Sequence, residues 1–188
     1  MSKFPYRLVI LDRDGVINVE RGHITSLDNF EIIEGVCEAI SKLNQDGVKI
    51  CVASNQSGLA RGILSEDVLL LLQEKFEENL TAMGGWIDQW FYSPWHPDLN
   101  LEGGIKKWLG EHEDRKPRAG MLNKALSFAE VDASEALMIG DSCKDAQAAE
   151  ISKIDFLGIK SAKVNELKKE KVYSNLLELV NNLFDYEG

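Results

Sequence analysis

Short apolar runs that alternate with amphipathic stretches are the feature that most constrains this sequence. The apolar runs are predicted strands, at 8–11, 48–53, 86–92, 136–139 and 154–159. The amphipathic stretches are predicted helices, at 36–43, from an N-cap at Ser65 to about Met83, and at 121–129, 145–151 and 172–184. Alternating strands and helices predict a mainly parallel sheet with helices on both faces, a three-layer α/β fold.

Length and composition indicate a soluble globular chain. Its 188 residues suit one domain, so we expect residues 1–188 to form a single unit. The net charge of −10 argues against a nucleic-acid or anionic-membrane partner. No apolar run approaches the roughly 20 residues of a membrane helix, and no secretory leader is visible. We expect a monomer.

The cysteines indicate a compartment. Cys37, Cys51 and Cys143 are odd in number and form no C-x-x-C pair, which favours reduced thiols. We therefore expect a cytoplasmic protein.

Polar clusters follow three of the predicted strands. They are Asp12 to Gly15, Ser54 to Gly58, and Gly140 to Ser142 with Asp145 beyond. In parallel sheets, ligands bind beyond the carboxyl ends of the strands. A lone Asp there is usually a turn former, but carboxylates that meet from two strands repel unless a cation joins them. Oxygen ligands of this kind suit Mg²⁺.

The chemistry of these residues points to phosphoryl transfer. The carboxylate of Asp12 can attack phosphorus, and Asp14 can donate a proton to the leaving oxygen and later take one from water. Ser54 and the amides after it can donate hydrogen bonds to the phosphoryl oxygens. Lys116 can balance the remaining negative charge.

Read together, the motifs resemble those of the haloacid dehalogenase superfamily. Asp12-Arg-Asp-Gly-Val is similar to the first motif of that superfamily, Ser54 to the second, Lys116 to the third and Gly140-Asp141 with Asp145 to the fourth. More narrowly, the segments 12–18, 54–62 and 115–121 resemble the heptose 1,7-bisphosphate phosphatases. The related histidinol-phosphate phosphatases share much of this pattern.

The resemblance implies a Rossmann-like fold without a large cap domain. It implies a nucleophile, Asp12, an acid/base, Asp14, and Mg²⁺ held by Asp12, the backbone carbonyl of Asp14, and Asp141. The phosphoryl group would be held by Ser54, Asn55 and Lys116. Arg61 and Arg115 would contact the distal part of a small phosphorylated metabolite, since Arg suits bidentate phosphate recognition. His23 is either a substrate contact or an ordinary loop residue.

One departure from that family stands out. Relatives commonly carry a structural zinc in the loop before the third motif, where this chain has Ser93, Trp95, His112 and Asp114. Because no thiolate remains, we expect no zinc and a loop held by packing. The alternative is a metal site made of His96, His112 and Asp114.

The leading hypothesis is a Mg²⁺-dependent phosphatase of a sugar phosphate, most plausibly the 7-phosphate of heptose 1,7-bisphosphate. Histidinol phosphate or another small monoester is the alternative substrate. A catalytically silent binding protein would be expected to lose Asp12 or Asp14, and both are present. A phosphotransferase or mutase usually needs a cap that excludes water, for which the short gaps leave little room.

Overall fold

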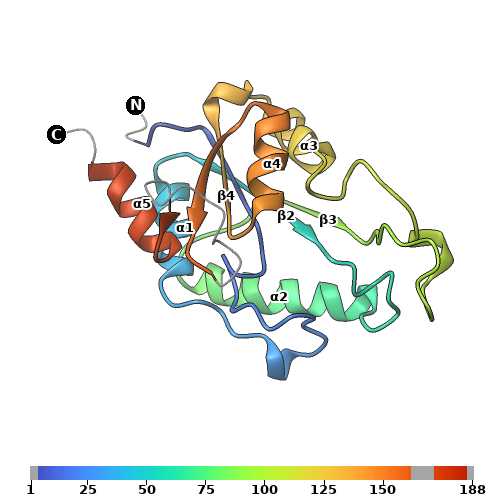
Figure 1. Ribbon diagram of the computed structural model, residues 1–188. Helices are drawn as coiled ribbons and strands as arrows, with labels where there is room; N and C mark the ends of the chain where they lie inside the picture. The colour runs from blue at the N-terminus through green and yellow to red at the C-terminus, as the bar shows by residue number, and fades with distance from the viewer. Residues whose placement is uncertain (1–3, 162–171, 186–188) are drawn as a thin grey trace.

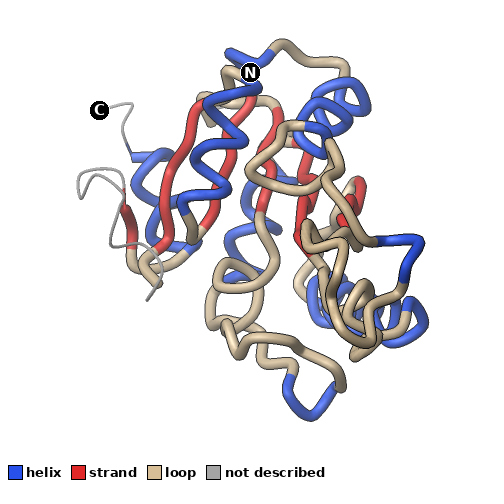
Figure 2. Tube along the Cα trace, turned by 45° about the vertical axis from the view of Figure 1, so that its right-hand side comes forward, coloured by secondary structure: helices blue, strands red, loops and turns tan. Residues whose placement is uncertain are grey.

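Six parallel strands form one sheet among the residues that the structure describes, 4–161 and 172–185 (Figures 1 and 2). In this computed structural model the strand order is β3-β2-β1-β4-β5-β6. The strands are β1 (Leu8–Leu11), β2 (Lys49–Asn55), β3 (Gln89–Ser93), β4 (Ala136–Gly140), β5 (Asp155–Ile159) and β6 (Val172–Tyr173). The helices are α1 (Val36–Gln45), α2 (Glu66–Ala82), α3 (Gly120–Ala129), α4 (Cys143–Ser152) and α5 (Leu176–Asp185).

Helices cover both faces of the sheet, which confirms the predicted three-layer α/β fold. Apolar side chains of α1, α2 and α5 pack on one face, and those of α3 and α4 pack on the other (Figure 1). Neighbouring residues of a strand point to opposite faces, so Val9 belongs to the first core and Ile10 to the second. Strands buried on both faces must be apolar throughout, which explains the sequence pattern that predicted them.

The predicted terminal helix at 172–184 is wrong at its start. Val172 and Tyr173 pair with Gly158 and Ile159 of β5 and form the short edge strand β6. The chain then turns, and α5 begins at Leu176, where the Asn175 side chain accepts a hydrogen bond from the Glu178 amide at 2.9 Å. Valine and tyrosine favour strands, and a partner edge was available, so tertiary pairing decided these two residues. The sequence at 160–171 is rich in charged residues, which favours a solvated connection before the last helix, and most of it lies outside the described residues.

The connections that leave the carboxyl edge carry no inserted domain. Between β1 and α1 the described chain forms only a 3-10 turn, Leu27–Asn29, and between β2 and α2 it forms a tight loop. A longer connection, residues 94–119, joins β3 to α3 and contains the 3-10 turn Lys106–Trp108; it extends to the right in Figure 1. The expected absence of a large cap therefore holds for these segments.

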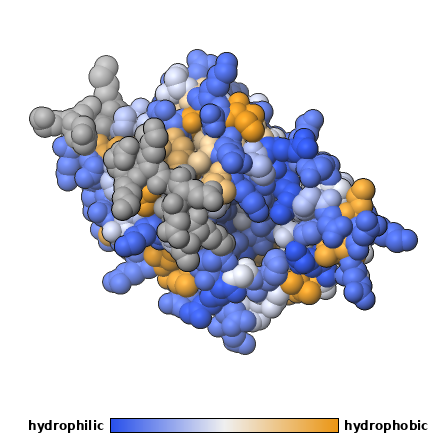
Figure 3. Space-filling view, viewed as in Figure 1, coloured by the Kyte–Doolittle hydropathy of each residue, from blue (hydrophilic) through white to orange (hydrophobic). Residues whose placement is uncertain are grey.

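The surface in Figure 3 is mainly hydrophilic, with hydrophobic residues in small separate groups. Among the described helices, none has both the length and the apolar character that crossing a membrane requires.

Candidate active site

The carboxyl ends of three neighbouring strands meet at one cleft. β1 lies between β2 and β4, so the residues that follow these strands are brought together. The cleft has a volume of about 440 Å³. Its lining includes most of the residues predicted from sequence, namely Asp12, Asp14, His23, Ser54, Asn55, Arg115, Lys116 and Asp141. Arg61 is the predicted site residue that does not line it.

A buried lysine lies at the floor of the cleft. The Lys116 ammonium lies 2.9 Å from Asp12 Oδ1 and 2.6 Å from Asp145 Oδ1, and it donates to the carbonyl oxygen of Ala53 at 2.7 Å. Its side chain is 2% exposed. All three N–H groups of the ammonium are therefore engaged, and the cation is fixed beside the Asp12 carboxylate.

Burial and charge act in opposite directions on this cluster. Burial raises the pKa of Asp12 to about 7, with help from the negative charges of Asp145 and Asp14, while the Lys116 charge opposes the rise. Burial alone would lower the pKa of Lys116, but Asp12 and Asp145 outweigh it and raise that pKa. Lys116 is therefore a permanent cation here, and Asp12 needs positive charge to stay ionised.

The same cluster fits a divalent metal. Oxygen atoms of Asp12, Asp141 and Asp145 lie within 4.8 Å of one another, and all three residues are buried. Gly15 makes room for this arrangement, since a Cβ there would lie 2.3 Å from Asp141 Oδ2 and its φ is +87°. Asp145 already forms an ion pair with Lys116, and its carboxylate accepts a hydrogen bond from the Ser142 hydroxyl at 2.6 Å. Hard oxygen donors in this number are the set that Mg²⁺ prefers.

Asp14 is held by three side chains that donate to it. Arg13 binds both carboxylate oxygens at 2.9 and 3.0 Å, Asn18 donates to Oδ1 at 3.0 Å, and Gln56 donates to Oδ2 at 2.9 Å. Burial alone would raise the pKa of Asp14, but the Arg13 charge and these hydrogen bonds keep it below its usual value.

Ser54 and Asn55 lie at the end of β2. Ser54 is buried, and its hydroxyl accepts a hydrogen bond from Gln56 Nε2 at 2.7 Å. The Asn55 amide donates to the Lys116 carbonyl at 2.9 Å and accepts from the Lys116 N–H at 3.0 Å. Asn55 therefore fixes the main chain that carries Lys116, and one of its own N–H groups remains for a ligand.

Arginines lie at the rim of the cleft. Arg115 lines it and donates to the Trp95 carbonyl oxygen at 2.6 Å. Arg61 lies further out, with its Nη2 2.8 Å from His96 Nε2. Partial burial and the charges of Arg61 and Arg115 lower the pKa of His96, so both guanidinium groups act on one imidazole. His23 is exposed and lines the cleft, with its ring beside Gly58.

The long connection is held by packing, as expected. Trp95 stacks on His112 with ring centroids 4.3 Å apart and planes 6° from parallel. The alternative metal site needs His96, His112 and Asp114 together, but among the described residues the acidic and histidine side chains that come close enough to hold one ion are those of Asp12, Asp141 and Asp145. His96 faces Arg61, His112 stacks on Trp95, and Asp114 accepts from Lys124 at 2.6 Å. Ser93 lies fully buried at the end of β3.

Three residues were given no role from the sequence, namely Arg13, Asn18 and Gln56. All of them lie within the motifs that revealed the site, and all of them bind Asp14. The available signal was an arginine directly after an apolar strand, between two aspartates, where burial demands an acceptor. The sequence does not show which side chains accept from the arginine, because that depends on the path of the loops after β1 and β2.

Comparisons with known proteins agree with this geometry. A family model described as polynucleotide kinase 3 phosphatase matches residues 8–172. A D-glycero-beta-D-manno-heptose-1,7-bisphosphate 7-phosphatase of Photorhabdus laumondii is 39% identical over 146 residues, which are 78% of this chain and 76% of that protein. The protein of the same name from Escherichia coli K12 is 37% identical over 141 residues, 75% of this chain and 72% of its own.

Solved structures show the same relationship. The D,D-heptose 1.7-bisphosphate phosphatase of B. bronchiseptica, complexed with magnesium and phosphate, matches with a TM-score of 0.84 at 29% identity. The match covers 96% of this chain and 99% of that one, so it includes every element that builds the cleft.

Proposed function

This chain is a phosphatase of the haloacid dehalogenase superfamily and belongs to the family of D-glycero-beta-D-manno-heptose-1,7-bisphosphate 7-phosphatases, and from that premise we propose that it removes the 7-phosphate of this sugar bisphosphate. The observation that carries the proposal is the buried group of Asp12, Lys116 and Asp141 beside Ser54 at the ends of β1, β2 and β4.

The first step is attack on phosphorus by Asp12. Its carboxylate oxygen forms a bond to phosphorus while the bond from phosphorus to the sugar oxygen breaks, which gives an aspartyl-phosphate. Asp14 takes up a proton from solvent before this step and gives it to the departing sugar oxygen. Hydrogen bonds from Arg13, Asn18 and Gln56 hold its carboxyl group in place. Ser54 and Asn55 donate to the phosphoryl oxygens, and the Lys116 ammonium stabilises their charge.

The second step returns the enzyme to its starting state. Asp14, now ionised, takes a proton from a water molecule, whose oxygen bonds to phosphorus as the bond to Asp12 breaks. Inorganic phosphate leaves, and Asp12 regains its carboxylate. The low pKa of Asp14 suits this form of the residue.

Asp12, Asp141 and the backbone carbonyl of Asp14 would hold Mg²⁺. When bound, the ion neutralises negative charge on the nucleophile and on the transferring group, and so favours ionised Asp12. The relative from B. bronchiseptica binds magnesium and phosphate, which supports this choice of metal.

The rim supports a substrate with a second negative group. Arg115 lines the cleft, and Arg61 lies near enough to act on the same His96 imidazole. Two guanidinium groups would bind the 1-phosphate, whereas the amine of histidinol would be repelled. His23, which also lines the cleft, would contact the sugar.

We further propose one domain over residues 1–188, a monomer, and a cytoplasmic location without a nucleic-acid or membrane partner. Cys37, Cys51 and Cys143 are all free thiols, which supports a reducing compartment. The net charge of −10 disfavours a polyanionic partner. Size-exclusion chromatography that gives a mass near 21.0 kDa supports the monomer, and twice that mass rejects it.

The experiment that tests the function compares phosphate release from several substrates with and without Mg²⁺. The substrates are both anomers of heptose 1,7-bisphosphate, histidinol phosphate and a DNA strand with a 3′-phosphate, the substrate class suggested by the family model's name. We expect the highest kcat/KM for heptose bisphosphate and loss of activity with EDTA that Mg²⁺ restores. A higher kcat/KM for either other substrate, or turnover unaffected by EDTA, rejects the proposal.

A further inference from the structure

The side-chain amide of Gln56 joins the two halves of the active site. Its Nε2 donates to Asp14 Oδ2 at 2.9 Å and to Ser54 Oγ at 2.7 Å, and its Oε1 accepts from Arg13 Nη2 at 3.1 Å. The residue is 5% exposed. One amide group therefore contacts both the acid/base side chain and the serine that faces the phosphoryl group.

Chemistry fixes the orientation of this amide. Turning it over would place Oε1 against the Asp14 carboxylate, two acceptors in contact, and Nε2 against the Arg13 guanidinium, two donors in contact. Both hydrogens of Nε2 are used, so Ser54 Oγ receives one and must direct its own hydroxyl hydrogen elsewhere. The open direction leads toward the cleft that Ser54 lines.

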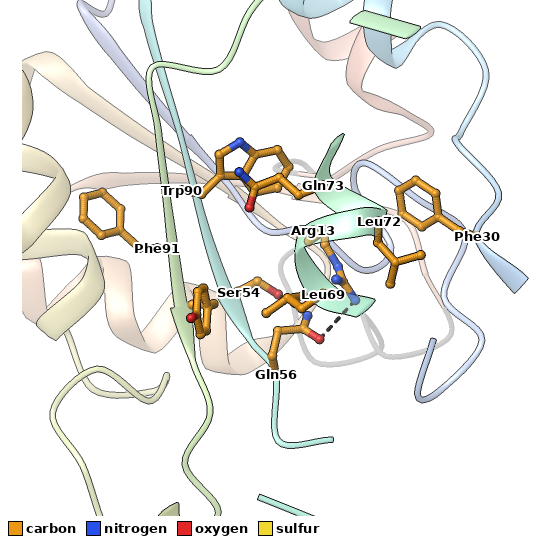
Figure 4. A pocket seen from close by; sticks show the side chains of 10 residues that line it. Arg13, Phe30, Ser54, Gln56, Leu69, Leu72, Gln73, Trp90 and Phe91 are labelled. Atoms are coloured by element: carbon orange, nitrogen blue, oxygen red, sulfur yellow. Dashed lines mark hydrogen bonds between the residues drawn. The ribbon is translucent and has the colours of Figure 1, made fainter. Parts of the chain in front are cut away.

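Arg13 reaches Gln56 from an apolar pocket. Figure 4 shows its guanidinium beside Phe30, Leu69 and Leu72, with the dashed hydrogen bond to Gln56. The Arg13 side chain is 6% exposed, and among the described residues its Nη1 has no hydrogen-bond partner. Because water is largely excluded, the guanidinium depends on Asp14 and Gln56, and it holds them more firmly than an exposed arginine would.

We propose that Gln56 is a positioning residue for the acid/base Asp14. Arg13 fixes the Gln56 amide, and the amide fixes the Asp14 carboxyl group relative to the serine that holds the phosphoryl group. The inference rests on the proposed role of Asp14. It adds Arg13 and Gln56, whose side chains are hydrogen-bonded to the Asp14 carboxyl group and, for Gln56, to Ser54 as well.

If Gln56 positions Asp14, replacing Gln56 should lower kcat/KM by a factor that depends on the leaving group of the substrate. A sugar alkoxide is a poor leaving group and needs a proton from Asp14, whereas p-nitrophenolate leaves without one. The value of kcat/KM reports steps up to formation of the aspartyl-phosphate, so later hydrolysis does not enter it. Weakened contacts from Ser54 to the phosphoryl group would slow both substrates equally.

The test measures kcat/KM of Gln56→Met with heptose 1,7-bisphosphate and with p-nitrophenyl phosphate. Since proton transfer contributes about 10²–10⁴-fold, we expect the loss for the sugar phosphate to exceed the loss for the aryl phosphate by about tenfold or more. In an Asp14→Asn background, the same substitution should cost both substrates the same small factor. Thermal melting checks the fold, and Gln56→Asn, which keeps a shortened amide, should show the same selective loss.

Gln73→Met is the matched control. Gln73 lines the same apolar pocket (Figure 4), but its amide donates to Glu77, and the described side chains that donate to Asp14 are those of Arg13, Asn18 and Gln56. We expect no selective loss from it. Equal losses on both substrates from the Gln56 variants, or a selective loss that persists without Asp14, overturn the inference alone. An Asp14→Asn enzyme that loses no more on the sugar phosphate than on the aryl phosphate overturns the role of Asp14 itself.

Discussion

The floor of the cleft, which includes Lys116, and the rest of the long connection at 94–119 are held together in opposite ways. On the floor, Lys116 is 2% exposed and forms ion pairs with Asp145 at 2.6 Å and with Asp12 at 2.9 Å. In the long connection the contacts are open to solvent, such as the ion pair of Arg118 with Glu111, whose side chains are 52% and 63% exposed. The long connection is stabilised by the packing of Trp95 on His112, whereas the floor is stabilised by buried ion pairs.

The residues proposed to carry out the reaction and those proposed to recognise the substrate are therefore held by different kinds of interaction. Removing one member of a buried ion pair leaves an unpaired charge and is costly, so the floor can change only as a unit. Exposed pairs contribute little, so residues of the long connection can change one at a time. A phosphatase can thereby keep one reaction while its rim adapts to new substrates. The predictions below test this contrast, from the largest expected effect to the smallest.

Asp12→Asn should have the largest effect. The amide cannot form the aspartyl-phosphate, so we expect kcat to fall by about 10⁴-fold or more, as for loss of a nucleophile in other enzymes. Asp155→Asn makes the same change at the far side of the sheet, where Asp155 accepts from the Tyr6 hydroxyl, and should leave kcat unchanged. Steady-state kinetics with magnesium in excess provides the measurement. If Asp12→Asn retains a tenth of the activity, another group is the nucleophile.

Lys116→Met should lower both activity and stability. It leaves the carboxylates of Asp12 and Asp145 buried without their ammonium, a loss of about 3–5 kcal/mol in the free energy of unfolding. We expect kcat to fall by about 10²–10³-fold, as when a preorganised donor is lost.

Lys124→Met is the comparison for that variant. Lys124 is more than half exposed and pairs with Asp114, so we expect a loss below about 1 kcal/mol. Urea unfolding of the two variants checks both values. Similar destabilisation by the two substitutions would remove the contrast between floor and long connection.

How much was predictable from sequence follows the same division. The strand ends with Asp12, Ser54 and Asp141 could be predicted, because parallel strands direct their carboxyl ends to one edge and apolar runs locate the strands. Lys116 comes from the end of the long connection, so no strand end locates it. Its need to balance negative charge and the resemblance to known motifs assigned it. The bonds of Gln56 to Asp14 and Ser54 depend on side-chain rotamers in two loops, which no periodicity encodes.

The error at the start of the last helix has a similar origin. Val172 and Tyr173 satisfy a helical pattern as well as a strand pattern, and pairing with β5 decided between them.

Trp95→Ala should affect binding more than chemistry. The loss of the stack on His112 is worth about 0.5–1.5 kcal/mol, so we expect KM to rise by up to about tenfold with kcat within twofold. The backbone carbonyl oxygen that accepts from Arg115 remains in this variant, but without the stack its position is less fixed. Trp86→Ala, at an indole residue that is 50% exposed, is the control and should leave KM unchanged. A fall in kcat with unchanged KM would show that the long connection belongs to the catalytic floor.

Arg61→Met should have the smallest effect. It tests recognition of the distal phosphate separately from catalysis and from binding of the sugar. Arg61 is at the exposed rim beside His96, where a charged contact contributes about 0.2–1 kcal/mol. We therefore expect KM for the 1,7-bisphosphate to rise by no more than about fivefold and kcat to stay the same, because a rim contact is made equally in the ground and transition states. A sugar 7-monophosphate lacks the distal group, so its KM should not change. Arg118→Met removes an exposed arginine of the long connection, one paired with Glu111, and should change neither value. If Arg61→Met raises KM for both sugars alike, Arg61 contributes only general positive charge, and Arg115 alone recognises the second phosphate.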